Sequence, residues 1–213
     1  MSNPSMSNNA PNDTATLANS SRSDAPKRVR VWDPLVRIFH WSLVAGFATA
    51  FIVEDDLLGV HVWAGYLVLA LISVRLIWGL IGTRHARFSD FVRGPGAVLA
   101  YLRDVVRLRA PRYLGHNPAG GAMIVLLLIS VAATGISGLA LYGAEEFAGP
   151  LAGVMRGLPP FLGEVLEETH EVLANVSLGL ILIHVAGVLA SSLLHHENLI
   201  GGMISGYKRQ EME

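Results

Sequence analysis

The chain has 213 residues, of which 52% are hydrophobic and only 15% are charged, and its net charge is −1. Soluble domains carry about a quarter charged residues, so a chain whose apolar residues gather in long runs is not expected to be water-soluble. The balanced charge gives no indication of a nucleic-acid partner. The sequence contains no cysteine, which excludes structural disulfides and any cofactor held through a thiolate. Eight histidines and six methionines remain as metal ligands.

Residues 1–27 are rich in Ser, Asn, Ala, Pro and Asp and contain no apolar stretch. A secretory signal needs a hydrophobic core behind a basic start, so this segment is not expected to be one. It is predicted to be a disordered cytoplasmic tail. The first apolar helix then acts as its own insertion signal and stays in the protein.

Four later segments are long and apolar enough to cross a membrane. An α-helix rises 1.5 Å per residue, so about 20 mostly apolar residues cross about 30 Å of hydrocarbon. Asp33 is expected to cap the first segment, and Pro34 suits its first helical position. The sequence therefore predicts an all-α integral membrane four-helix bundle over residues 28–209, with spans at about 34–53, 60–81, 119–143 and 169–194.

The segments that connect these spans separate by charge. Basic residues precede the first span, and seven arginines from Arg84 to Arg112 lie between the second and third. The other two connections are acidic, with Glu54, Asp55 and Asp56 in one and five glutamates between Glu145 and Glu168 in the other. Because basic flanks stay on the cytoplasmic side, both termini are predicted to be cytoplasmic. The long basic connection is expected to contain an interfacial helix after Pro95, with apolar residues on one face and arginines on the other.

Four histidines lie in or next to the predicted spans. A histidine inside a membrane is costly and usually functional, although a single one could equally be a buried side chain hydrogen-bonded to a neighbouring helix. Four of them weaken that alternative. His170 and His184, in the fourth span, are fourteen residues apart, which places them within about 40° of one helix face and ~21 Å apart along the axis.

The direction of each span pairs these histidines by depth. The first span runs outward, so His40 lies in the inner half, whereas the second runs inward and begins with His61 at the outer end. The fourth also runs inward, with His170 outside and His184 deeper. Matching the levels pairs His40 with His184 and His61 with His170. Two sites of paired imidazoles at two depths suit two haem b groups, bound without covalent bonds.

A porphyrin between helices also needs small residues beside it and cations for its propionates. Arg37 and Arg75 are candidates to pair with propionates of the inner haem, and extension to the inner interface is an equal alternative. Ordinary helix packing is likewise an equal alternative for the glycines. The candidate small residues are Gly65, Gly135, Gly138 and Gly187.

The other four histidines are expected to be solvated or interfacial. His85 and His116 belong to the basic connection or its edge, and His195 and His196 follow the fourth span. One of them could border a quinone site as a proton partner.

Several stretches resemble the bacterial cytochrome b-561 family, which includes the b-type cytochrome subunit of nickel-iron hydrogenases. They are Arg37-Ile38-Phe39-His40-Trp41, the His61-x-x-x-Gly65 pair, Arg75-Leu76-Ile77-Trp78-Gly79, and Glu168-Thr169-His170-Glu171 with His184. The resemblance covers about residues 28–209. It implies a four-helix, di-haem, quinone-linked cytochrome of the bacterial inner membrane, with the same histidine pairing.

The leading hypothesis is therefore transfer of electrons between the quinone pool and a periplasmic redox partner, as a carrier or subunit and not as a stand-alone catalyst. The partner would be a soluble cytochrome or a hydrogenase-type oxidoreductase, which leaves the direction of electron flow open. Alternatives are a cytochrome b subunit that anchors a nickel-iron hydrogenase, a histidine-based metal or proton transporter, and a structural anchor without haem. Membrane lipid is an expected partner, and nucleic acid is not. The sequence leaves open whether the protein forms a homo-oligomer.

Overall fold

The computed structural model describes residues 28–54, 56–159 and 161–209. The predicted tail over residues 1–27 lies outside this part of the chain. Residues 30–208 form one unit, which contains every long helix. Residues 28, 29 and 209 belong to a second unit.

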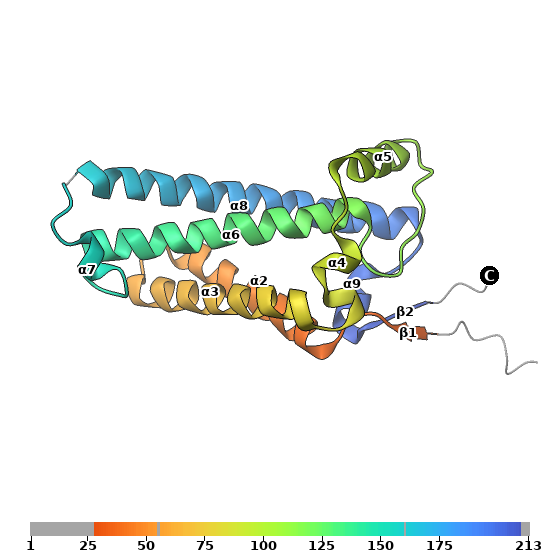
Figure 1. The fold of residues 1–213 in the computed structure, drawn as a ribbon, viewed down its shortest axis with the longest axis horizontal. Coiled ribbons are helices and arrows are strands. Elements are labelled where there is room, and N and C mark those ends of the chain that lie inside the picture. The colour runs from red at the N-terminus through yellow and green to blue at the C-terminus, as the bar shows by residue number, and fades with distance from the viewer. Residues whose placement is uncertain (1–27, 55, 160, 210–213) are drawn as a thin grey trace, which may run out of the picture. The chain divides into compact units, whose positions relative to one another are not determined.

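Four long helices dominate the larger unit (Figure 1). All four are long and apolar enough to cross a membrane, which confirms the predicted all-α membrane bundle. α8 begins about two helical turns before the expected start of its span. α6 packs most extensively against α8 and α2 against α3, while α3 also contacts α6. The helices are α2 (Pro34–Val53), α3 (Leu58–Ile81), α6 (Pro118–Glu145) and α8 (Phe161–Leu194).

A side-chain cap fixes where α2 begins. The Asp33 carboxylate accepts a hydrogen bond from Val36 N at 2.9 Å, and Pro34 occupies the first turn, as predicted. The same carboxylate accepts from Trp78 Nε1 at 3.1 Å and Thr83 Oγ1 at 2.5 Å. Burial alone raises the pKa of Asp33, but the hydrogen bonds outweigh burial and hold this pKa below its ordinary value. The start of α2 is therefore tied to the end of α3.

The shorter helices of the larger unit lie at the two ends of the bundle. Figure 1 shows α4, α5 and α9 at one end and α7 at the other. α5 follows Gly94, as expected for the interfacial helix, and its Leu99, Leu102 and Val106 are exposed. β1 and β2 pair in a two-stranded sheet. These elements are β1 (Arg28–Arg30), η1 (Arg84–Ala86), α4 (Phe88–Phe91), α5 (Pro95–Val106), α7 (Ala152–Met155), α9 (Leu199–Ser205) and β2 (Tyr207–Arg209).

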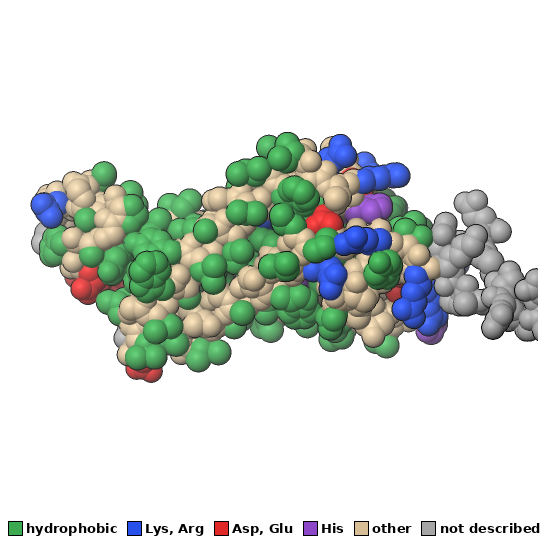
Figure 2. All heavy atoms as spheres, turned by 90° about the horizontal axis from the view of Figure 1, so that it is seen from below, with side chains coloured by type: hydrophobic (Ala, Val, Ile, Leu, Met, Phe, Trp, Pro, Cys, Tyr) green, Lys and Arg blue, Asp and Glu red, His purple; other side chains and the backbone are tan. Residues whose placement is uncertain are grey.

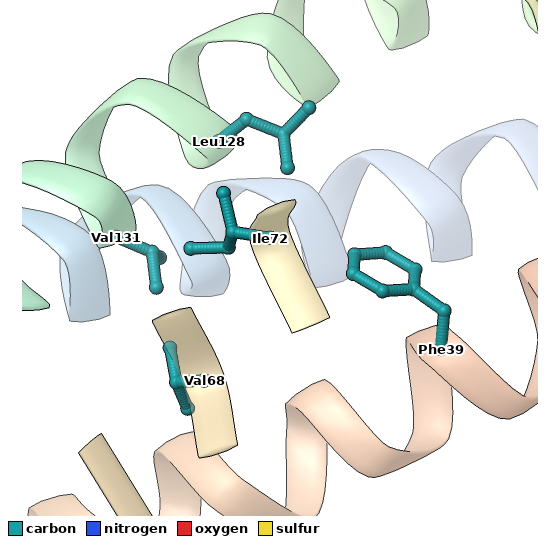
Figure 3. Close-up of a cluster of buried hydrophobic side chains, with 5 residues drawn as sticks. All are labelled: Phe39, Val68, Ile72, Leu128 and Val131. Carbon is teal, nitrogen blue, oxygen red and sulfur yellow. The ribbon is translucent and has the colours of Figure 1, made fainter. Parts of the chain in front are cut away.

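The surface of the bundle is more apolar than that of a soluble protein. Figure 2 shows hydrophobic side chains over its middle, with basic side chains gathered toward the end that carries α4, α5 and α9. Large apolar residues such as Ile77 and Leu193 are mostly exposed, as expected for side chains that face lipid. A small apolar core joins α2, α3 and α6 (Figure 3) and consists of Phe39, Val68, Ile72, Leu128 and Val131.

Candidate functional site

His61 and His170 lie against each other near the end of the bundle that carries α7. His61 is in the first turn of α3, and His170 lies in the third turn of α8. Their ring centroids are 5.9 Å apart and their planes are nearly perpendicular, at 76°. These two residues, more than a hundred positions apart in the chain, are the pair that the sequence places at the outer level.

Both imidazoles are oriented by main-chain carbonyl groups of neighbouring helices. The Nδ1 atom of His61 lies 3.0 Å from the Ala50 carbonyl oxygen in α2. The Nδ1 atom of His170 lies 3.0 Å from the Thr134 carbonyl oxygen in α6. A carbonyl can only accept a hydrogen bond, so both Nδ1 atoms carry the proton. Nε2 is then the nitrogen whose lone pair can bind a metal, the arrangement typical of metal-ligating histidines.

The His170 ring rests on three residues of α6, here called the α6 cradle: Thr134, Ser137 and Gly138. Ser137 Oγ lies 3.0 Å from His170 Nδ1. A Cβ atom at Gly138 would lie 2.8 Å from His170 Cε1, closer than real Cβ contacts. Glycine at this position therefore allows the ring to approach the helix. The sequence suggested close packing at Gly138 but gave no reason to select Thr134 or Ser137.

His40 and His184 form the second predicted pair and are close enough to interact electrostatically. Both are partly buried. His40 Nδ1 is buried and has no hydrogen-bond partner among the described residues. The His40 ring meets Trp41 edge-on, with centroids 5.1 Å apart. The inner pair is thus less completely oriented than the outer pair, and it retains an unsatisfied polar atom.

The predicted small residues differ in their surroundings. A Cβ atom built at Gly65 or Gly187 would meet nothing within 4 Å. Gly65 is partly buried and lies one turn after His61, so it borders open space beside that ligand candidate. Gly135 instead lies against Leu69 of α3, whose Cδ2 would be 2.6 Å from an added Cβ. In this structure Gly135 is a point of close approach between α3 and α6.

Neither predicted arginine extends freely into solvent. Arg75 is only 3% exposed, and its guanidinium lies over the Phe88 ring, 5.0 Å from the centroid. Arg75 Nη1 is buried without a hydrogen-bond partner among the described residues, and so is Arg37 Nε. Arg37 Nη2 donates to the Ile204 carbonyl oxygen of α9. A buried guanidinium nitrogen without a hydrogen-bond partner is costly, so these atoms suit an anionic group such as a propionate.

His116 is the histidine that departs most from expectation. Expected to be solvated or interfacial, it is instead packed between Trp32 and Phe91, with centroid distances of 4.5 and 4.8 Å. Its Nδ1 is buried without a hydrogen-bond partner among the described residues. Burial, assisted by the positive charges of Arg75 and Lys208, lowers the pKa of His116 to about 3. Contacts between such distant segments leave no periodic signal in the sequence, so its burial could not be read there.

The donor set fits an iron porphyrin. Among the described residues, no group of three or more His, Cys, Asp or Glu side chains could hold a bare metal ion. A pair of imidazoles suits a metal whose remaining positions are filled by a porphyrin. At a centroid distance of 5.9 Å, the His61 and His170 rings are close enough for both to bind one metal through bonds of about 2 Å. The space beside Gly65 and the unsatisfied arginines agree with the same group.

The proteins to which the chain is similar in sequence are described as cytochromes. Three relatives are each a probable Ni/Fe-hydrogenase B-type cytochrome subunit. That of Rhizobium leguminosarum bv. viciae is 23% identical, over 90% of this chain and 93% of the relative. Those of Azotobacter vinelandii and Azotobacter chroococcum mcd 1 are 22% and 24% identical, each over 84% of this chain and 88% of the relative. No solved structure matches the chain.

The family assignment follows from the extent of the match. The sequence profile of the prokaryotic cytochrome b561 family matches residues 31–206, which include all four long helices. This confirms the resemblance seen in the sequence. Together with the apolar helices, it identifies a multi-pass bacterial membrane protein that binds b-type haem and serves electron transfer. The chain belongs to the prokaryotic cytochrome b561 family.

Proposed function

We propose that this cytochrome holds two b-type haems and transfers electrons between the quinone pool and a redox partner on the periplasmic side of the inner membrane. His61 and His170 would hold the outer haem, and His40 and His184 the inner one. The observation that carries the proposal is the outer pair. Its ring centroids lie 5.9 Å apart, and both Nδ1 protons are held by carbonyl groups of other helices.

Haem b, when bound, supplies the one-electron chemistry, and the residues of the chain supply binding and orientation. The carbonyl oxygens of Ala50 and Thr134 keep the Nε2 atoms of the outer pair in the ligating tautomer. Arg37 and Arg75 would neutralise propionates of the inner haem, because each has a buried nitrogen without a hydrogen-bond partner among the described residues. Gly65 leaves room for the outer porphyrin.

The orientation in the membrane follows from charge. The basic residues between α3 and α6 would lie on the cytoplasmic side, and the acidic connections on the periplasmic side. His61 and His170 would then be the pair closer to the periplasm. A redox partner that docks at this end meets the glutamates at the start of α8, among them Glu164, Glu167 and Glu168.

A hydrogenase is the second candidate for this partner, and the cytochrome would then also anchor that enzyme to the membrane. The observation that favours it is the description of the three relatives as hydrogenase cytochrome subunits. Electrons would then flow from the hydrogenase to quinone. The family match favours electron transfer over a histidine-based transporter.

Haem content in histidine variants tests the proposed pairing. The purified protein should show a b-type α-band in its reduced-minus-oxidised spectrum and contain two haems per chain. His61→Ala, His170→Ala and the double variant should each retain one haem, because both residues would serve the same iron. The double variant His61→Ala with His184→Ala should retain none.

His85→Ala is the matched control for these variants. His85→Ala should leave both haems in place, because the His85 ring is bonded to Asp90 outside the spans, with 3.0 Å between Nδ1 and Oδ2. A colourless preparation of well-folded, haem-supplied protein would refute the cytochrome assignment for this chain. Loss of both haems from the His61→Ala and His170→Ala double variant, with one retained in each single variant, would refute the pairing.

A further inference from the structure

α6 contains no histidine, yet its hydroxyl groups form a buried hydrogen-bond network with α8. On α8, Ser177 is the one buried residue among those described and is fully enclosed. Its Oγ lies 2.7 Å from Ser130 Oγ and 3.1 Å from Thr134 Oγ1, both on α6. Thr134 Oγ1 donates to the Ser130 carbonyl at 3.0 Å. Ser177 must therefore donate to Thr134 and accept from Ser130, so all three hydroxyl protons are used.

This contact lies midway between the two histidines of α8. Ser177 is seven residues after His170 and seven before His184. Seven residues turn the helix to within about 20° of two full turns, so all three side chains lie close to one face of α8. Each histidine is about 10 Å from Ser177 along the axis. A fixed contact at Ser177 consequently fixes the rotation of α8 and presents the imidazoles toward the bundle.

Ser137 acts on the His170 ring itself. The Ser137 hydroxyl donates to the Thr134 carbonyl oxygen at 2.8 Å. With its proton committed there, Ser137 Oγ offers a lone pair to the His170 Nδ1–H at 3.0 Å. The Nδ1–H is thereby shared between Ser137 Oγ and the Thr134 carbonyl oxygen. Two acceptors hold the one imidazole proton, and Gly138 keeps the approach open.

We propose that Ser137 is a positioning residue that orients His170 and sets the redox potential of the outer haem alone. The inference rests on the proposed function, because it takes His170 as a ligand of that haem. An acceptor at Nδ1–H makes the imidazole a stronger electron donor, which favours the oxidised iron. Removing one of the two acceptors should therefore raise the potential of the outer haem and leave the inner haem unchanged.

Three serine variants of the full-length protein in lipid or detergent test the inference. Ser137→Ala removes the hydroxyl acceptor, and Ser137→Thr keeps a hydroxyl at the same position. Ser73→Ala is the matched control, because the exposed Ser73 hydroxyl of α3 donates to the Leu69 carbonyl of its own helix and takes no part in the contacts between α6 and α8. The measurements are haem content, an optical redox titration and the low-spin electron paramagnetic resonance signals. The outer haem is identified as the one that disappears in His170→Ala.

Ser137→Ala should retain two haems and raise the ferrous-to-ferric ratio of the outer haem at least threefold at a fixed ambient potential near its midpoint. A tenfold change corresponds to 59 mV for one electron. Ser137→Thr should restore the ratio, and Ser73→Ala should leave it within twofold of the parent. Unchanged potentials in Ser137→Ala, an equal shift of both haems, or an equal shift in Ser73→Ala would each overturn the inference.

Failure of the inference is distinguishable from failure of the proposed function. If His170→Ala retains two haems, the ligand assignment fails, whatever the serine variants do. If His170→Ala loses one haem but Ser137→Ala leaves both potentials unchanged, only the role of Ser137 fails. Loss of the outer haem in Ser137→Ala supports the inference when Ser137→Thr retains it, and overturns it when both variants lose it.

Discussion

Replacing Gly138 by alanine should loosen the outer haem more than any change of similar size elsewhere in the bundle. The added Cβ would lie 2.8 Å from His170 Cε1 and 3.2 Å from Nδ1, whereas ordinary contacts begin at 3.4 Å. The ring must retreat by about 0.6 Å, which lengthens its 3.0 Å bond to the Thr134 carbonyl to about 3.6 Å. At that length the interaction is no longer a hydrogen bond.

Three energy terms set the cost of this substitution. The lost hydrogen bond costs about 1 kcal/mol, and crowding in a packed site costs about 1–3 kcal/mol. Alanine returns about 1 kcal/mol through its helix propensity. The net cost of about 1–3 kcal/mol corresponds to roughly 5- to 150-fold weaker retention of the outer haem.

Haem content per chain under limiting haem supply measures this loss. The control is Gly179→Ala, because Gly179 lies on the opposite face of α8 from His170 and an added Cβ there meets nothing within 4 Å. That variant should keep both haems. If Gly138→Ala also kept both, with the outer potential unchanged, the close contact between α6 and His170 would have no functional weight.

Three further changes follow from contacts outside the ligands. Ser177→Ala should lower the free energy of unfolding in detergent by about 1–2 kcal/mol, because it breaks both bonds of a fully buried hydroxyl; an equal loss in Ser73→Ala, whose hydroxyl is exposed, would contradict this. Glu197→Gln should cost about 3–5 kcal/mol, since its carboxylate side chain is only 10% exposed and holds Arg112 at 2.9 Å and Lys208 at 3.3 Å. The exposed Glu164→Gln serves as control, and similar melting temperatures for the two variants would refute the role of these two ion pairs. His116 should make the free energy of unfolding depend on pH, because its pKa of about 3 in the folded protein lies below the ordinary value of 6.5. The stabilisation by the neutral, buried ring is complete above pH 6.5 and is lost as the pH falls toward 3. Thermal unfolding between pH 7 and 4 should therefore show a shallower decline in His116→Gln, and parallel curves would contradict the burial of this side chain.

The main features of the fold were predictable because the membrane imposes a simple rule on composition. Four apolar runs predicted four helices, and the cap at Asp33 was recognisable from the adjoining Pro34. The start of α8 was not, because a hydropathy argument locates the part of a helix that lies in lipid. Glutamate is a good helix former, so the acidic stretch that includes Glu164 and Glu168 continues the helix beyond that part.

The histidines of the site were accessible to sequence reasoning, whereas the groups that orient them were not. His61 and His170 could be paired by their depth in the membrane. The group that orients His61 is the main-chain carbonyl of Ala50, and every residue type has such a carbonyl, so the sequence gives no sign of this contact. Ser137 is one of several small polar residues in α6. It differs from the others because the rotation of α8 brings the His170 ring against it. His116 likewise acquires its environment from Trp32, which lies far away in the chain.

The contact at Ser177 explains why a helix without ligands governs the geometry of the outer site. A large apolar side chain midway between His170 and His184 would push α8 away from α6, because the residue there is fully enclosed. The small hydroxyl allows a 2.7 Å bond to Ser130 instead. Close approach at this level is what allows His170 to reach the Thr134 carbonyl. The segment from His170 to His184 therefore has to meet two requirements. It needs a ligand at each end and a small polar residue, Ser177, midway between them.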